Sequence, residues 1–145
     1  MAFHGTFEHS LDAKNRLTVP SKFRSALAGK VFLVRGADPC ISVYPESVYT
    51  AIAEEALARL NPLSPQAKQL RRFFYSMADD LELDGAGRIT LNAIQLEHAQ
   101  MKGREAVIAG AGESLEIWAR DAWERYEADL TTQAPDLTAA LVHPA

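Results

Sequence analysis

The sequence lacks the features on which disulfide-stabilised, secreted and membrane-spanning proteins depend. Cys40 is the single cysteine among 145 residues, so no intramolecular disulfide framework can form. No apolar run approaches the roughly 20 residues that a membrane helix needs, and the N-terminal segment lacks the basic and apolar regions of a signal peptide. We therefore expect a soluble, cytoplasmic protein of about one domain that makes no contact with a membrane. A 48% share of apolar residues is enough for a buried core.

Residue patterns typical of enzymes and metal sites are missing as well. Four histidines are dispersed without the spacing of metal ligands: His4, His9, His98 and His143. The Gly-Ala-Gly sequence at residues 110–112 lacks the third glycine of a dinucleotide-binding loop. Cys40 stands in an apolar strand pattern, which favours an inert buried thiol over a nucleophile. We predict no enzymatic activity, no metal, no cofactor and no small-molecule substrate.

Charge is distributed unevenly along the chain. The net charge is −4, which argues against nonspecific binding of polyanions by the whole surface. Residues 1–72 nevertheless have a net charge of +4, and residues 73–145 one of −8. Residues 13–36 contain six basic side chains and no acid: Lys14, Arg16, Lys22, Arg24, Lys30 and Arg35. Such a stretch indicates either a selective patch for polyanions or a solvated charged face.

The chain contains an internal repeat with an offset of 72 residues. Residues 11–19 and 83–91 both place an apolar residue before Asp-x-x-x-Arg and an apolar-Thr-apolar triplet after it. The conserved polar pairs are Asp12 with Asp84, Arg16 with Arg88, and Thr18 with Thr90. A fixed period indicates that one structural unit is used twice.

Each copy of the motif predicts a strand, a tight loop and a second strand. Asp12 and Asp84 can accept hydrogen bonds from nearby backbone N–H groups and so shape a turn. Asn15 and Gly87 precede the two arginines, and both residue types tolerate a positive φ. We therefore expect each arginine to be presented where the chain re-enters a sheet.

Apolar periodicity and turn residues predict the other elements. Expected strands cover residues 6–11, 17–19, 31–34, 40–44, 81–83, 89–91, 106–109 and 115–118, and expected helices cover 20–28, 45–60, 65–77, 92–101 and 120–130. This order gives an α+β fold of two β-hairpin–helix–β-hairpin repeats. We assign residues 6–48 to the first repeat, 49–78 to connecting helices, 79–130 to the second repeat and 131–145 to a flexible tail.

The repeated arginine favours nucleic-acid binding, although a structural interpretation is available. Asp and Arg can simply bracket a turn and pair with each other, and for one copy alone that interpretation would be preferred. Two copies, the first inside the basic stretch, favour DNA, because arginine suits phosphate oxygens and guanine edges and a two-stranded β element fits the major groove. The second copy lies among Asp79, Asp80 and Glu82. We therefore expect the first copy to contact DNA and the second mainly to retain structure.

Four segments resemble the MraZ family: residues 6–20, 40–45, 83–89 and 115–118. The resemblance extends to about residue 130 and includes both Asp-x-x-x-Arg motifs. The family is similar to AbrB-like transcription factors, so the resemblance implies a swapped-hairpin β-barrel with flanking helices. It also implies a bacterial transcriptional repressor of the division and cell-wall gene cluster. Such a protein binds repeats in double-stranded promoter DNA, forms a ring-shaped homo-oligomer and associates with the nucleoid.

The resemblance also suggests which residues form the site. The matched motif residues are Asp12 and Arg16, with Lys14 between them, and Asp84 and Arg88. The family usually has glycine where this chain has Asn15, whose side chain would limit how closely the loop approaches DNA.

Together with the basic stretch, the resemblance leads us to expect the following roles. DNA contacts are expected from Lys14, Asn15, Arg16, Lys22 and Arg24, and loop shaping from Asp12 and Gly87. The alternative is an oligomeric protein-binding module of antitoxin type, in which the helices at residues 45–60 and 120–130 hold a partner and the basic loop is incidental.

Overall fold

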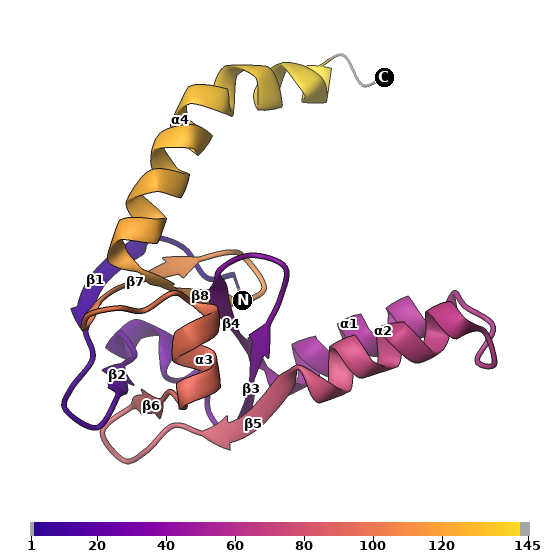
Figure 1. Ribbon diagram of the computed structural model, residues 1–145, viewed down its shortest axis with the longest axis horizontal. Helices are drawn as coiled ribbons and strands as arrows, with labels where there is room; N and C mark the ends of the chain where they lie inside the picture. The colour runs from indigo at the N-terminus through magenta and orange to yellow at the C-terminus, as the bar shows by residue number, and fades with distance from the viewer. Residues whose placement is uncertain (1, 143–145) are drawn as a thin grey trace.

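The computed structural model describes residues 2–142, which form two antiparallel sheets and four α-helices (Figure 1). The strands are β1 (Thr6–Ser10), β2 (Arg16–Thr18), β3 (Lys30–Arg35), β4 (Cys40–Pro45), β5 (Ala78–Glu82), β6 (Arg88–Thr90), β7 (Glu105–Gly110) and β8 (Leu115–Ala119). The helices are α1 (Glu46–Ala58), α2 (Pro65–Ser76), α3 (Ala93–His98) and α4 (Arg120–Val142), with a 3-10 turn η1 at Ser21–Phe23. The α+β class with two repeats therefore agrees with the sequence analysis.

The two repeats exchange their first strands. The six-stranded sheet has the order β1-β7-β8-β4-β3-β5, so β1 of the first repeat pairs with β7 of the second, and β5 of the second pairs with β3 of the first. The remaining two strands, β2 and β6, pair only with each other. Within residues 2–142 the edge strands β1 and β5 do not pair, so the sheet is open rather than a closed barrel.

The register of the strands follows a local two-fold symmetry. In the ribbon β2–β6, Leu17 lies opposite Ile89, its own equivalent at the offset of 72 residues. In the large sheet, Ser42 lies opposite Glu116, its equivalent at an offset of 74. The two halves of this one chain are thus related to each other in the same way as the two subunits of a symmetric dimer.

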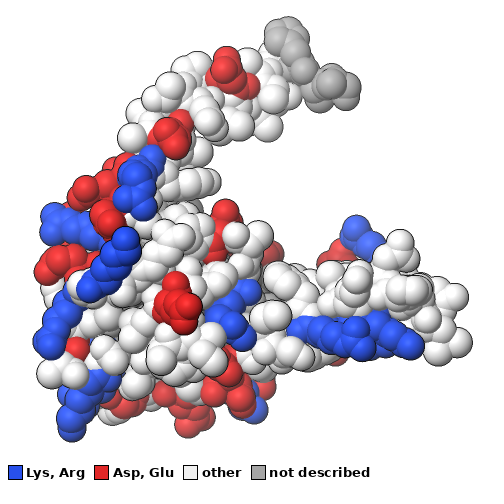
Figure 2. Space-filling model, in the orientation of Figure 1, with Lys and Arg blue, Asp and Glu red and all other residues white. Residues whose placement is uncertain are grey.

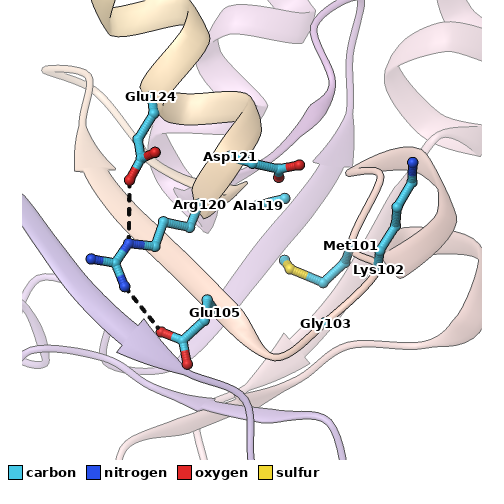
Figure 3. A pocket seen from close by; sticks show the side chains of 8 residues that line it. All are labelled: Met101, Lys102, Gly103, Glu105, Ala119, Arg120, Asp121 and Glu124. Carbon is cyan, nitrogen blue, oxygen red and sulfur yellow. Dashed lines mark hydrogen bonds and ion pairs between the residues drawn. The ribbon is translucent and has the colours of Figure 1, made fainter.

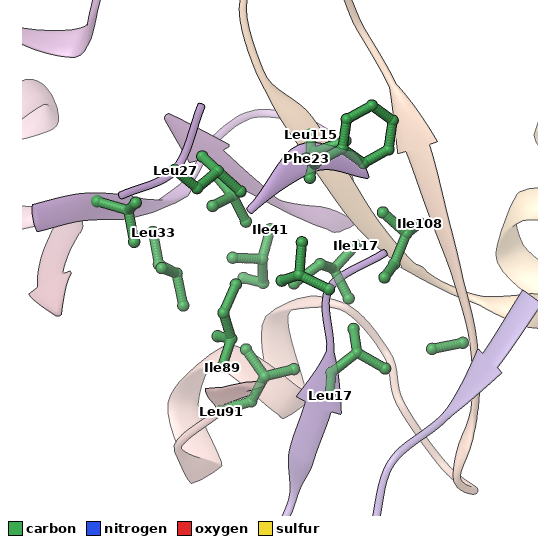
Figure 4. Close-up of a cluster of buried hydrophobic side chains, with 14 of the residues drawn as sticks. Leu17, Phe23, Leu27, Leu33, Ile41, Ile89, Leu91, Ile108, Leu115 and Ile117 are labelled. Atoms are coloured by element: carbon green, nitrogen blue, oxygen red, sulfur yellow. The ribbon is translucent and has the colours of Figure 1, made fainter. Parts of the chain in front are cut away.

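The larger of two apolar clusters joins the two halves (Figure 4). Its residues come from β2 and β6, from the central strands and from the segment after β2; they include Leu17, Phe23, Leu27, Leu33, Ile41, Ile89, Leu91, Ile108, Leu115 and Ile117. Because each half contributes one wall of this core, neither repeat buries its apolar face alone.

The first repeat does not contain the helix expected at residues 20–28. The chain there forms only η1, in which the N–H of Phe23 donates to the Pro20 carbonyl at 3.0 Å. The equivalent helix of the second repeat, α3, begins with a capping box in which Asn92 and Gln95 each bind the other's backbone N–H at 2.8 Å. Pro20 stands at the position of Asn92 and has no side-chain acceptor for a cap, so the first segment lacks this start.

Helix α4 continues past the expected end at residue 130. It is helical to Val142, so residues 131–142 of the assigned tail are α-helix, and residues 143–145, including His143, lie outside the described part. Pro135 lies inside the helix and removes one backbone donor. Figure 1 shows that the distal part of α4 bends and projects away from the sheet.

Helices α1 and α2 form an arm that projects from the other side of the body (Figure 1). Tyr49 of α1 is buried, and its hydroxyl donates to the Phe74 carbonyl of α2 at 2.7 Å. Ser64 caps α2 by accepting from the Ala67 N–H at 3.1 Å, with Pro65 in the first turn, as the sequence predicts. None of the described helices is both long enough and apolar enough to cross a bilayer.

Candidate nucleic-acid interface

The ribbon β2–β6 presents both repeated arginines on one face. Side chains alternate along a strand, and Leu17 and Ile89 are buried beneath the ribbon. The opposite face therefore carries Arg16, Thr18, Arg88 and Thr90, with Arg16 opposite Thr90 and Thr18 opposite Arg88. Two arginines that are 72 residues apart in the sequence thus share one small surface.

The carboxylate of Asp12 holds the first loop in place. Its Oδ1 accepts from the backbone N–H groups of Lys14 at 2.8 Å and Arg16 at 2.9 Å. Its Oδ2 accepts from Nε of Arg16 at 2.6 Å. Asn15 adopts a positive φ of 58°, which lets the chain turn back toward Arg16. One side chain therefore fixes both the backbone of the loop and the direction of its arginine.

The second loop repeats these contacts. Asp84 accepts from the N–H groups of Ala86 and Arg88, each at 2.9 Å, and from Nε of Arg88 at 2.7 Å. Gly87, with a φ of 74°, takes the position of Asn15. The two loops therefore have the same construction, although their sequences and surrounding charges differ.

Reciprocal backbone hydrogen bonds fix the loops relative to each other. The N–H of Val19 donates to the Gly87 carbonyl at 2.9 Å, and the N–H of Leu91 donates to the Asn15 carbonyl at 2.9 Å. The residue with positive φ in each loop thus binds the strand end of the other repeat. Neither loop can move without disturbing the other.

Both aspartates are ionised at neutral pH. The backbone N–H of Arg16 is the largest influence and, with the Arg16 side chain and the Lys14 N–H, lowers the pKa of Asp12 to about 2. The Arg88 backbone N–H and side chain likewise lower the pKa of Asp84. The Arg16 and Arg88 side chains are 28% and 31% exposed. Their terminal N–H groups have no hydrogen-bond partner within residues 2–142, so they are available to a ligand.

The basic and polar residues expected to contact DNA do not all lie on the first loop. Lys14 and Asn15 are exposed on the first loop. Lys22 lies over the rings of Phe7 and Phe23, with its Nζ 4.7 and 4.9 Å from their centroids.

Arg24 lies beside the second loop rather than the first. Its Nε donates to the Val19 carbonyl at 3.1 Å. A Cβ placed on Gly87 would lie only 2.6 Å from Cζ and 2.7 Å from Cδ of Arg24. A side chain at position 87 would therefore displace the end of the Arg24 side chain, and no local sequence pattern indicates this contact.

The basic residues of segment 13–36 do not form one patch. Lys30 pairs with Asp80 at 3.4 Å and with Glu46 at 3.8 Å. Arg35 lies at the base of the arm, against residues of α2 and α3. Basic and acidic side chains alternate over much of the body on the face seen in Figure 2. Lys30 and Arg35 therefore lie apart from the ribbon, and the candidate interface is limited to the ribbon and its loops.

A cavity of about 300 Å³ beside α4 is bordered by an ion-pair network (Figure 3). Arg120 binds Glu8 at 2.9 Å, Glu105 at 3.4 Å and Glu124 at 3.4 Å. These contacts tie α4 to β1 and β7, which gives Arg120 a structural role that the sequence does not reveal. Glu105 and Glu124 beside this cavity are paired with Arg120, and Asp121 is paired with Arg125 at 3.5 Å.

Other reactive groups are shielded or dispersed. Cys40 is 3% exposed, and burial, with a smaller effect from Glu116, raises its thiol pKa to about 12. The thiol is therefore protonated at neutral pH. Among the described residues, no three His, Cys, Asp or Glu side chains are placed together to hold a metal ion.

Comparison with known proteins connects this geometry with a family. The family model described as MraZ protein, antitoxin-like, matches residues 2–73 and again residues 74–141. Three similar curated relatives are each named transcriptional regulator MraZ. The relative from Nocardia farcinica is 40% identical, over 88% of this chain and 87% of its own length. The one from Alkaliphilus oremlandii is 38% identical over the same shares. The one from Lactiplantibacillus plantarum is 36% identical over 97% of this chain and 98% of its own length.

The Asp12 contacts predict a specific pH dependence. The folded-state pKa of about 2 lies below the ordinary value of 3.8, so the ionised carboxylate stabilises the fold above pH 3.8. That stabilisation should decrease as the pH falls from 3.8 toward 2. A carbon NMR titration of the Asp12 carboxyl should give a midpoint near 2, and Asp12→Asn should reduce the acid sensitivity of unfolding. A midpoint at the ordinary value would contradict the loop geometry.

The contact between Arg24 and Gly87 predicts an unequal cost for two glycine substitutions. Gly87→Ala should destabilise the protein by at least about 1–2 kcal/mol, because its φ is left-handed and its Cβ would meet Arg24. Gly85→Ala in the same loop, where a Cβ meets nothing within 4 Å, should change stability by less than about 1 kcal/mol. Chemical denaturation measures both. Arg24→Ala should lower the cost of Gly87→Ala, and an unchanged cost would show that the two residues do not interact.

Proposed function

This chain belongs to the MraZ family, whose curated members are transcriptional regulators, and we propose that it is a DNA-binding regulator that contacts promoter DNA through the ribbon β2–β6. The observation that carries the proposal is the position of Arg16 and Arg88 on one face, each aimed by an aspartate. In this role the protein represses the division and cell-wall gene cluster, including its own promoter, and is a DNA-bound, nucleoid-associated cytoplasmic protein rather than an enzyme.

The dimensions and chemistry of the ribbon support duplex DNA as its ligand. A two-stranded antiparallel ribbon fits the major groove, where arginine can bind O6 and N7 of guanine. Because Nε of each arginine is engaged by aspartate, the terminal N–H groups are pre-oriented for a base edge or a phosphate oxygen. The loops are built alike, so Arg88 joins Arg16 in the proposed contact instead of serving structure alone. The hydroxyls of Thr18 and Thr90 are further donors on this face.

The flanking residues extend the proposed contact. Lys14 and Asn15 at the tip of the first loop would meet the phosphate backbone, with the Asn15 side chain limiting the closest approach. Lys22 and Arg24 flank the ribbon, Lys22 beside β1 and Arg24 beside the second loop. Each neutralised phosphate adds roughly 0.9 to the salt slope on duplex DNA, so one such face binds weakly.

We propose that a ring-shaped homo-oligomer overcomes this weakness by placing several ribbons along promoter repeats. Linked sites can raise affinity about 10²–10⁴-fold without new contacts. Two exposed helical faces support assembly. The basic helix α2 exposes Tyr75 on the side that carries Lys68 and Arg72, and the acidic helix α4 exposes Tyr126, Leu130, Leu137 and Leu141 on one side.

These two faces are complementary and lie on different sides of the body (Figure 1). α2 carries three basic residues and no acid, and α4 carries five acids against two arginines; Figure 2 shows the basic side chains along the arm. Contact between unlike faces of successive copies generates a ring when the rotation closes. The exchange of β1 and β5 further supports the swapped-hairpin arrangement of AbrB-like proteins, with β2–β6 covering one end of the open sheet.

Binding to the DNA upstream of the chain's own gene tests the proposal. Arg16→Ala and Arg88→Ala should each weaken the specific complex by about 1–3 kcal/mol if they read bases. Arg59→Ala, which removes an exposed ion pair with Glu55 on the arm, is the matched control and should bind normally. Fluorescence anisotropy over a range of salt concentrations gives the affinities and the salt slope. If no specific complex forms at low ionic strength, the protein-binding alternative of antitoxin type replaces this function.

Mass determination in solution tests the proposed assembly independently of DNA. Leu130→Asp on α4 should reduce the number of subunits, because it places a carboxylate in the apolar part of the proposed interface. Ile94→Asp, at an exposed position on α3, should leave the mass unchanged. Light scattering after size exclusion measures both variants. A monomeric unmodified protein would rule out the ring.

A further inference from the structure

A groove runs along α1 beside the turn between β7 and β8. Two adjoining depressions, of about 330 and 280 Å³, share Ile52, Glu55 and Glu113 and therefore form one continuous groove. Its apolar floor consists of Val48, Ile52 and Ala56, which are four residues apart and so lie on one side of the helix. These three side chains are half-buried. The groove is separate from the ribbon and from the α2 and α4 faces of the proposed ring.

The turn between α1 and α2 displays a leucine at the free end of the arm (Figure 1). Leu63 is 83% exposed, the highest value among the large apolar side chains of residues 2–142. Its position is fixed, because its N–H donates to Oδ1 of Asn61 at 3.0 Å. Nη1 of Arg71 also ties α2 to the turn by donating to the Pro62 carbonyl at 3.2 Å. One exposed leucine is ordinary on a protein surface, but here a groove of matching chemistry lies on the same arm.

The two ends of the arm are also complementary in charge. Acids border the groove: Glu113 makes no ion pair within residues 2–142, and Glu55 pairs with Arg59 at 2.9 Å. The free end is basic, because Arg59 and Arg71 stand on either side of the turn. An apolar tip with basic neighbours therefore matches an apolar groove with acidic borders. Because α1 is one continuous helix, its tip cannot fold back onto its own groove, so the two can meet only between different copies of the chain.

We propose that two copies of this chain pair through antiparallel α1 helices, with Leu63 of each copy in the groove of the other. Ala56 stands eight residues after Val48 and seven before Leu63. A two-fold axis near Ala56 therefore brings each leucine over the Val48 end of the other groove and Glu113 toward Arg59 of the other copy. This contact is isologous, unlike the head-to-tail contact between α2 and α4. It leaves the ribbon uncovered, and it joins copies whether or not the ring forms.

Light scattering on the full-length protein tests the pairing. Each copy makes the contact once, so Leu63→Asp should halve the mass whatever the number of subunits in a ring. Ile94→Asp, at an exposed position on α3, should leave the mass unchanged. Leu130→Asp, which breaks the proposed ring contact, should leave a dimer, and adding Leu63→Asp should give a monomer. An unchanged mass for Leu63→Asp overturns the pairing, whereas an unchanged mass for Leu130→Asp counts against the ring alone.

Charge exchange and cross-linking locate the contact on α1. Glu113→Lys should also halve the mass, and combining it with Arg59→Glu should restore the mass, because the ion pair between copies is then reversed rather than lost. Glu55→Cys, near the proposed axis, should be cross-linked between copies by a short bismaleimide at least about fivefold more than Glu54→Cys, a neighbouring exposed position about 100° around the helix. Cys40 is buried and does not compete. Equal cross-linking at the two positions, or no recovery on charge exchange, would overturn the proposed pairing.

Discussion

The hydrogen bonds that each loop makes to the other repeat are the constraint on which the rest of the molecule depends. Val19 binds the Gly87 carbonyl and Leu91 binds the Asn15 carbonyl, so the ribbon β2–β6 is locked at the local two-fold axis. That lock buries Leu17 against the core on one side and holds both arginines on the other. The packing of the core and the geometry of the proposed DNA-contacting face are therefore set by the same few contacts.

The sequence was enough to predict the structural features that depend on residues close together in the chain. The Asp-x-x-x-Arg spacing is enough to predict a loop in which the carboxylate binds backbone N–H groups, and Asn15 and Gly87 have the positive φ expected of them. Pairing between distant strands was not predictable, because nothing in β1 itself specifies that it pairs with β7 of the other repeat. For the same reason the sequence left open whether the basic side chains of residues 13–36 form a patch or a solvated face, and in the fold Lys30 pairs with acids on β5 and α1.

The two repeats have diverged within a shared geometry. The Arg24 side chain lies so close to the second loop that a Cβ at position 87 would displace it, whereas the first loop has Asn15 at the equivalent position. Pro20 removes the cap that Asn92 gives to α3, which leaves only a 3-10 turn in the first repeat. The two halves also differ in charge, because the basic helix α2 ends the first half and the acidic helix α4 ends the second. A symmetric scaffold thus carries an asymmetric surface.

The exchange of first strands also constrains how this protein can be synthesised. Thr6 pairs with Ala109, so the N-terminal strand has no partner strand until most of the chain has been translated. Contacts this distant in sequence slow folding, and an unpaired strand edge is prone to association while it waits. On a polysome, β1 of one nascent chain could pair with β7 of a neighbouring nascent chain instead of its own. Rapid completion of the C-terminal half therefore protects the N-terminal half from pairing with the wrong copy.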